Sequence, residues 1–168
     1  LRTSNPSNEF ELKTQVSSGS DNHVGGNSLI NLKLMDGLSM RVASVYNYND
    51  GFRENVPQIA TNTNKREESL YRMKLGYVPN EKLDFLATII YGKMQNGYDA
   101  WAPDNNTDFK TYSDSKGEDS QLTYGYSLRG NLNVEENIQV TSITSFTETD
   151  LIHAYDGDWA DSAYWHDN

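Results

Sequence analysis

The sequence of 168 residues contains no cysteine, no long apolar run and no cluster of basic residues. Without cysteine, a disulfide framework, a thiolate nucleophile and a cysteine-ligated zinc site are excluded. The net charge of −10 argues against a nucleic-acid partner, because phosphate contacts need clustered Lys and Arg. The longest apolar runs, such as LATIIY, are too short for a membrane-spanning helix. The opening LRTSNPSNEF lacks both an initial Met and an apolar signal core, so we expect a mature or cut-out segment of a longer protein.

Motifs of catalysis are also missing. There is no G-x-S-x-G nucleophile elbow and no glycine-rich phosphate loop, and His23, His153 and His166 are scattered. Asp156 and Asp158 stand two residues apart, but a glycosidase pair is defined by its separation across the fold, which the sequence does not give. We therefore predict that the chain is not an enzyme and that it has no cofactor.

The loop DNNTDFKTYS has part of a calcium-binding pattern. Asp104, Asn106 and Asp108 have the spacing of the first three ligands of an EF-hand. However, Phe109 stands where that loop needs Gly, and Ser115 where it needs Glu. We predict no metal site here, and interpret the segment as a solvated turn rich in Asp and Asn.

Eleven Tyr, five Phe and three Trp are many aromatic residues for a mean hydropathy of −0.76, and this combination argues against disorder. Apolar and polar residues alternate with a period of two, which is typical of β-strands, and no stretch supports a helix. The alternating runs span residues 9–16, 28–34, 39–48, 70–77, 83–94, 121–132 and 137–148. The predicted fold is all-β: an antiparallel up-and-down meander of about seven long strands.

The predicted connections alternate in length. Short hairpin turns are expected at 35–37, 78–82 and 133–137. The intervening corners are longer, at about 17–27, 49–68, 95–119 and 150–168. Tight turns at one end of a sheet and long loops at the other are typical of outer-membrane β-barrels, which have short periplasmic turns and long external loops.

Side chains on the two faces of the predicted strands favour the same interpretation. Aromatic residues lie near the ends of the apolar faces, as at a bilayer interface: Tyr46, Tyr48, Tyr71, Tyr77, Phe85, Tyr91 and Phe146. The opposite faces carry side chains suited to a water-filled lumen: Arg41, Arg72, Lys74, Asp84, Arg129 and Gln139. A soluble antiparallel sandwich with its apolar faces packed together is the alternative.

Four stretches of the chain resemble the early part of the barrel of TonB-dependent outer-membrane receptors. NPSNEFE resembles the exit from the plug domain into the first barrel strand, and NKREESLYRMKLGYVPNEKLDF the third hairpin region. NGYDAWAPDNN with TYSDSKGEDSQLTYGYSLRG is similar to an external loop and its returning strand. TSITSFTETDLIHAYDGDW is similar to the next strand and the acidic, aromatic loop above it.

The resemblance implies that residues 1–168 are part of a transmembrane barrel of about 22 strands in the outer membrane of a Gram-negative bacterium. Such a receptor takes up a scarce solute, for example a siderophore, cobalamin or an oligosaccharide. Its partners would be outer-membrane lipid, its own plug domain, the inner-membrane TonB complex and the small-molecule ligand. A soluble carbohydrate-binding β module with aromatic loops is the alternative function. Six loop residues are candidates for ligand binding: Tyr98, Trp101, Tyr155, Asp156, Asp158 and Trp159.

Overall fold

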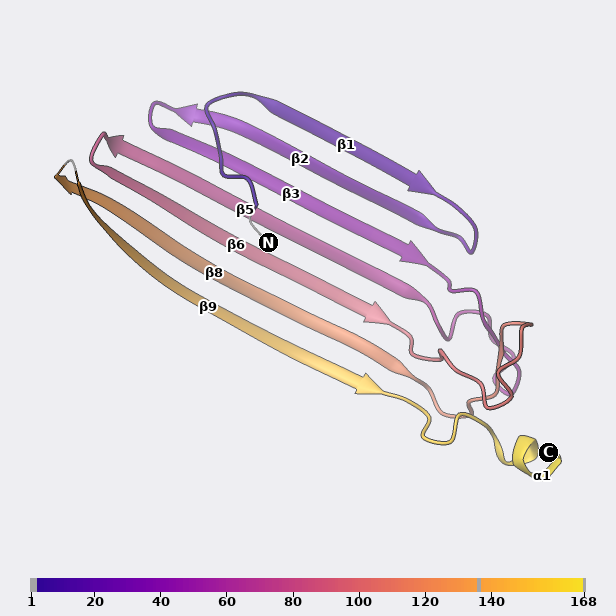
Figure 1. Ribbon diagram of the computed structural model, residues 1–168. Helices are drawn as coiled ribbons and strands as arrows, with labels where there is room; N and C mark the ends of the chain where they lie inside the picture. The colour runs from indigo at the N-terminus through magenta and orange to yellow at the C-terminus, as the bar shows by residue number, and fades with distance from the viewer. Residues whose placement is uncertain (1–2, 136, 168) are drawn as a thin grey trace.

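The computed structural model describes residues 3–135 and 137–167. The chain forms one antiparallel sheet of seven strands, each paired with its neighbour in the sequence (Figure 1). The strands are β1 (Glu11–Ser18), β2 (Val24–Met35), β3 (Leu38–Asn49), β5 (Arg66–Asn80), β6 (Leu83–Asn96), β8 (Glu118–Glu135) and β9 (Ile138–Ala154). The predicted all-β, up-and-down meander is therefore confirmed. β1 and β9 are the edges of the sheet.

The strands begin earlier or end later than the alternating runs predicted. Residues 24–27, placed in a corner, belong to β2 and pair with both β1 and β3, which leaves only the tight turn 19–23. The long loops shrink in the same way, to 50–65, 97–117 and the residues after Ala154. Backbone pairing continues beyond the apolar side chains, since the ladder needs only N–H and C=O groups, and this explains the error.

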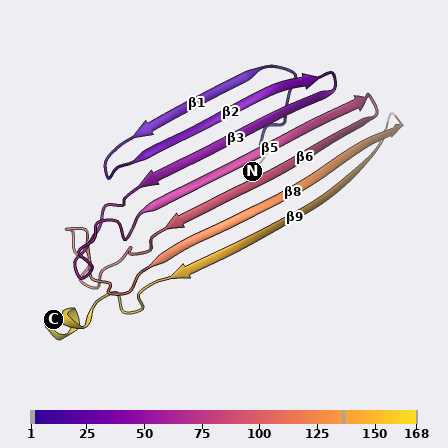
Figure 2. The same ribbon diagram turned by 180° about the vertical axis from the view of Figure 1, so that it is seen from behind.

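The turns between β2 and β3, β5 and β6, and β8 and β9 lie at the opposite end of the sheet from the long loops, whereas the tight turn 19–23 lies at the same end as these loops (Figure 2). Asp36 and Gly37 connect β2 to β3, and Gly37 has a φ of 75° that glycine adopts without steric cost. The predicted turn at 78–82 is shorter in the structure, because β5 runs to Asn80 and β6 starts at Leu83. Of the turn predicted at 133–137, Glu136 lies outside the described residues.

Three short elements lie in the long loops. β4 (Glu54–Asn55) and β7 (Lys110–Thr111) pair in parallel. The helix α1 (Ser162–Asp167) was not predicted; its six residues are too few to display a helical period. Asp161 precedes it and accepts a hydrogen bond from the backbone N–H of Tyr164 at 2.8 Å, as an N-cap residue does. No helix among the described residues has the length and apolar character needed to span a membrane.

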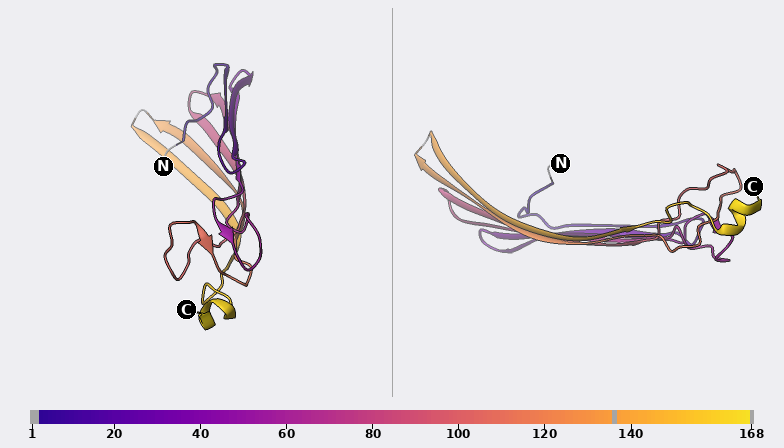
Figure 3. Two further views of the ribbon diagram at one scale, coloured as in Figure 1. Left: turned by 90° about the vertical axis from the view of Figure 1, so that its right-hand side faces the viewer. Right: turned by 90° about the horizontal axis from the view of Figure 1, so that it is seen from below.

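The sheet is a single curved layer (Figure 3). Residues 3–9 cross its concave side, toward which the hairpin-turn end curls. Lys74 Nζ donates to the carbonyl oxygens of Thr3 and Ser4 at 3.0 and 3.1 Å, and Asn31 Nδ2 donates to that of Ser7 at 3.0 Å. The side chains of Asn31 and Lys74 therefore lie on the concave face.

Strand pairing extends this face across the sheet. Asn31 pairs with Arg41, Arg41 with Lys74, and the row continues through Thr88, Ser127 and Ser145. The concave face thus carries the six polar residues predicted to share one side: Arg41, Arg72, Lys74, Asp84, Arg129 and Gln139.

The convex face is apolar. Its central row runs across the sheet from Ile30 through Val42, Met73, Ile89 and Tyr126 to Phe146. Phe146 was predicted near a strand end but lies in the middle of β9, stacked on Tyr126 at a centroid distance of 5.5 Å. No second layer covers either face, and the only buried apolar side chains of the described residues are Ala102 and Ala160, both in loops.

The exposed surface reflects this architecture. The chain exposes 11294 Å², whereas a compact monomer of its mass, 19.0 kDa, exposes about 8,400 Å². Domains that are stable in water bury the apolar face of a sheet against another layer. The convex face therefore calls for an apolar environment that the chain itself does not supply.

Candidate functional site

The three long loops come together in a compact platform at one end of the sheet, formed by residues 50–65, 97–117 and 155–167. Parallel pairing of β4 with β7 joins the first two loops, and a bridge between Tyr112 and Ala160 joins the third. Backbone hydrogen bonds strengthen the first contact, from Glu54 N–H to the Phe109 carbonyl and from Val56 N–H to the Thr111 carbonyl, both at 3.0 Å.

A buried carboxylate, that of Asp99, lies at the centre of the platform and is 2% exposed. Its Oδ2 accepts hydrogen bonds from Asn55 Nδ2 at 2.8 Å, Thr63 Oγ1 at 2.7 Å and Thr111 Oγ1 at 2.5 Å. Its Oδ1 accepts one from Ser113 Oγ at 3.0 Å. Because burial of a charge requires such compensation, Asp99 ties the first two loops into one unit.

No motif in the sequence predicts this network. Asp99 lies in the segment NGYDAWAPDNN, in which the sequence analysis predicts only Tyr98 and Trp101 as binding residues. Its four partners come from two loops, up to 44 residues away in the chain. Isolated polar residues in a loop look solvated until the fold brings them together.

A second centre is an aromatic cluster formed by Tyr98, Trp101, His153, Tyr155 and Trp159. Tyr155 and Trp159 are stacked at 5.7 Å and 17°, and Trp101 lies edge-on to Trp159 at 6.0 Å. Tyr98 packs against His153 at 4.7 Å and Trp159 at 5.9 Å. The structure thus brings together the four aromatic residues among the six candidates and adds His153, which sequence reasoning missed.

The two candidate carboxylates, those of Asp156 and Asp158, do not belong to the aromatic cluster. Asp156 is 6% exposed and accepts hydrogen bonds from the backbone N–H groups of Asp114 at 2.9 Å and Ser115 at 3.4 Å, which fastens the third loop to the second. Although burial raises the pKa of Asp156, hydrogen bonds to the carboxylate hold this pKa below its ordinary value. Asp158 is exposed, contributes hydrogen bonds to the Asp156 carboxyl group and accepts a long bond, 3.5 Å, from the Ala160 N–H.

Asp104 and Asn106 form a turn of their own. Asn106 Nδ2 donates to Asp104 Oδ1 at 2.7 Å, and the backbone N–H groups of Asp108 and Lys110 donate to Asn106 Oδ1 at 3.2 and 3.1 Å. The hydrogen bond from Asn106 lowers the pKa of Asp104. Within the described part of the chain, no group of three or more His, Asp or Glu side chains is arranged to hold a metal ion.

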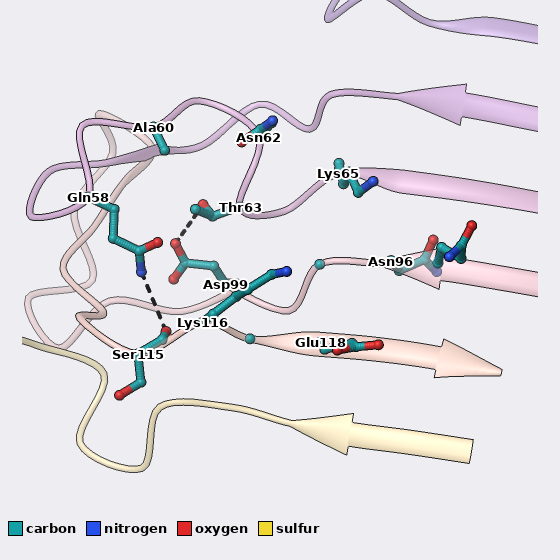
Figure 4. A pocket seen from close by; sticks show the side chains of 13 residues that line it. Gln58, Ala60, Asn62, Thr63, Lys65, Asn96, Asp99, Ser115, Lys116 and Glu118 are labelled. Atoms are coloured by element: carbon teal, nitrogen blue, oxygen red, sulfur yellow. Dashed lines mark hydrogen bonds between the residues drawn. The ribbon is translucent and has the colours of Figure 1, made fainter. Parts of the chain in front are cut away.

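A polar hollow of about 400 Å³ opens between the loops beside Asp99 (Figure 4). Gln58 and Asn62 contribute from the first loop, Lys65 from the start of β5 and Lys116 from the end of the second loop. None of these four residues was a candidate from the sequence. Close backbone approaches shape the floor, where Gly97 and Gly117 lie against the carbonyl groups of Thr63 and Tyr98 with no room for a Cβ atom.

Comparison with known proteins identifies no relative of this chain. No family model matches it, no curated protein matches it, and no solved structure matches it. The class defined by its own geometry is therefore an all-β chain with one open antiparallel sheet, a polar concave face, an apolar convex face and a loop platform at one end.

Proposed function

We propose that the chain is part of the wall of a transmembrane β-barrel in the outer membrane of a Gram-negative bacterium. In this proposal the convex face contacts lipid and the concave face lines the interior. The observation that supports it is the curvature: the apolar rows lie on the convex side and the polar rows on the concave side. A barrel in water requires the reverse, with its apolar side chains inside.

The apolar band has aromatic residues at both borders. Tyr71, Tyr91 and Tyr124 pair in a row across β5, β6 and β8 on the side of the loops, and Tyr77 pairs with Phe85 on the side of the turns. The seven residues from Tyr71 to Tyr77 span about 20 Å along the strand. Outer-membrane barrels have an apolar band about 25 Å tall, with aromatic residues at both borders.

The concave face suits a barrel whose interior is occupied by a plug domain. Its centre carries the row of Asn31, Arg41 and Lys74. Asn31 and Lys74 hydrogen bond with backbone carbonyl groups in residues 3–9, and Arg41 Nη1 donates to Glu11 Oε2 at 2.8 Å. Nearer the loops, Val45, Leu70 and Ile90 line an apolar hollow of about 380 Å³. A folded plug offers both polar and apolar partners to such a surface, whereas a water-filled pore needs only polar ones.

The function that we propose is energy-coupled uptake of a scarce solute by a TonB-dependent receptor. The loop platform would lie outside the cell and take part in solute capture, and the inner-membrane TonB complex would act on the plug domain. This step rests on the resemblance of the four sequence stretches and on the asymmetry between tight turns and a built loop platform. A soluble carbohydrate-binding module is less well supported, because the convex face lacks a covering layer.

The test places the same substitution, Ile to Glu, on each of the two faces of the sheet in separate variants. Ile89 lies in the central convex row and Ile143 on the concave face, opposite Arg129. Placing a carboxylate in lipid costs about 2 kcal/mol near the centre of the membrane, whereas the concave face accepts it. We expect Ile89→Glu to lower the fraction of chain that floats with liposomes several-fold, and Ile143→Glu to leave it unchanged. Equal behaviour of the two variants, or a wild-type chain that is monodisperse in buffer without detergent, would contradict the proposal.

A further inference from the structure

The ionisable residues that line the polar hollow beside Asp99 are two lysines, Lys65 and Lys116, and two acids, Asp99 and Glu118. The chain as a whole has a net charge of −10, yet Lys65 and Lys116 both contribute to the lining of this one hollow. Its volume, about 400 Å³, is within the range of small-molecule sites, which is about 300–1,000 Å³. We propose that it binds a small hydroxylated carboxylate, of the chemical class of the sugar acids.

The anionic residues of the hollow have partners already. The carboxylate of Asp99 accepts four hydrogen bonds from neutral donors, and Glu118 accepts one from Ser120 Oγ at 2.7 Å. Asp99 therefore fixes the wall of the hollow through its hydrogen bonds to both loops. Its burial makes it a positioning residue for the loops.

The cationic residues, by contrast, have donor capacity to spare. Across residues 3–135 and 137–167, Lys116 Nζ has no hydrogen-bond or ion-pair partner, and Lys65 Nζ has one distant partner, Glu67, at 3.7 Å. Two ammonium groups at the rim of one hollow fit a ligand with a single carboxylate, since charge-assisted hydrogen bonds are the strong ones.

The remaining polar groups suit hydroxyl groups. Gln58 Nε2 donates to the carbonyl oxygen of Ser113 at 3.0 Å, which holds this amide in place and leaves its oxygen as an acceptor. The amide of Asn62 has neither donor nor acceptor occupied by a described residue. Amides offer both donors and acceptors, as a hydroxyl group requires, and no aromatic side chain lines the hollow to favour an apolar ligand.

The hollow is also rigid enough to bind. Gly97 N–H donates to the Lys65 carbonyl at 2.9 Å, and Gly97 and Gly117 allow backbone segments to touch below it. A site formed in advance loses little entropy when a ligand enters. In the proposed receptor this site would be the first contact of the solute with the wall, so the inference on the solute's class rests on the proposed function, although binding itself does not.

In the experiment, glucuronate or glucose is titrated into the full chain in detergent micelles, and isothermal titration calorimetry measures the affinity of each. The two sugars differ in one group: glucuronate has a carboxylate where glucose has a hydroxymethyl group. We expect glucuronate to bind at least about tenfold more tightly than glucose, and Lys116→Gln and Lys65→Gln each to weaken glucuronate about tenfold. The control Lys82→Gln makes the same change of charge in a hairpin turn at the other end of the sheet and should have no effect.

The inference would be overturned by equal affinity for glucose and glucuronate, or by glucuronate binding that survives both Lys116→Gln and Lys65→Gln. Absence of glucuronate binding at millimolar concentration, with circular dichroism showing an intact β-sheet, would also overturn it. The flotation of Ile89→Glu and Ile143→Glu with liposomes is measured separately. Failure of the sugar-acid site with flotation intact leaves the membrane proposal standing, and the opposite pattern leaves a binding site on a protein of another location.

Discussion

The sheet and the loop platform of this chain are stabilised in opposite ways. The sheet has seven long strands with regular pairing and no side-chain core, since the apolar convex row is half-exposed at Ile30 and Val42 and exposed from Met73 to Phe146. The platform has little regular structure but holds buried polar groups, among them Asn55, Asp99 and Thr111. The comparison shows that the loops are built to keep a shape in water, whereas the sheet requires an apolar surrounding.

The largest expected effect breaks the platform alone. Asp99→Ala removes the acceptor of four hydrogen bonds and leaves the buried hydroxyl groups of Thr111 and Ser113 without an acceptor. Each unpaired buried donor costs about 1–3 kcal/mol, so we expect a local loss of at least about 3 kcal/mol. Hydrogen exchange in residues 97–117 should accelerate about a hundredfold, while exchange in β5 and β6 stays slow.

The matched control for Asp99→Ala is Asp158→Ala, which removes an exposed carboxylate from the same platform. Its exchange pattern should equal that of the wild type. If Asp99→Ala accelerated exchange in strands and loops alike, the sheet and the platform would unfold as one unit, and the contrast between them would be wrong.

A smaller effect is expected at the floor of the hollow. A Cβ atom at position 117 would overlap the carbonyl group of Tyr98, whereas a Cβ at Gly157, in the third loop, meets nothing within 4 Å. Gly117→Ala should destabilise the platform by about 1–3 kcal/mol, because backbone has to move, and Gly157→Ala should change little. Thermal unfolding followed by tryptophan fluorescence measures both, since Trp101 and Trp159 belong to the platform. Equal melting temperatures of Gly117→Ala and Gly157→Ala would show that Gly117 is not held against the Tyr98 carbonyl group.

The smallest effect is the pH dependence of one turn. Asp104 accepts a hydrogen bond from Tyr112 Oη at 2.9 Å; burial and this bond raise the pKa of Tyr112 to about 12, and the bond from Asn106 lowers that of Asp104. Because the pKa of Asp104 is lowered in the folded state, the stability that this carboxylate contributes is lost as the pH falls through that pKa. Because the pKa of Tyr112 is raised, the stability that this phenol contributes is present below pH 10 and is lost as the pH rises toward 12. The protection factors of the amides around residues 104–112, which divide out the intrinsic pH dependence of exchange, should therefore be highest between about pH 5 and pH 9. Asp104→Asn should flatten the acid side; an unchanged acid side in this variant would assign the effect to another group.

How far the sequence predicts this structure differs between the two regions. The alternation of residues such as Met73, Lys74 and Leu75 predicts strands, faces and their order, because a period of two has one structural meaning. Strand ends were wrong where the side chains carry no alternation, as at Gly25 and Gly26, which pair by backbone alone. The platform could not be predicted from the sequence, because Asp99 acquires its hydrogen-bond partners only when loops distant in the sequence meet.

The candidate binding residues show both outcomes. Aromatic side chains gather wherever they can bury area, so the meeting of Tyr98 with Tyr155 and Trp159 follows from their type. Asp156 was chosen for its charge but fastens two loops, and the lysines of the polar hollow were missed since neither stands in a motif. A role in ligand binding stays a prediction for all six candidates.

The central claim, that the convex face lies in lipid, is tested most directly by spin labels. The chain has no cysteine, so single Cys variants at positions 85–91 of β6 can be labelled without background. In liposomes, labels at positions 85, 87, 89 and 91 should collide with oxygen, which dissolves in lipid, and labels at 86, 88 and 90 with a water-soluble nickel complex. Such alternation is the predicted result. High nickel accessibility at every position, or none of the alternation, would contradict the account.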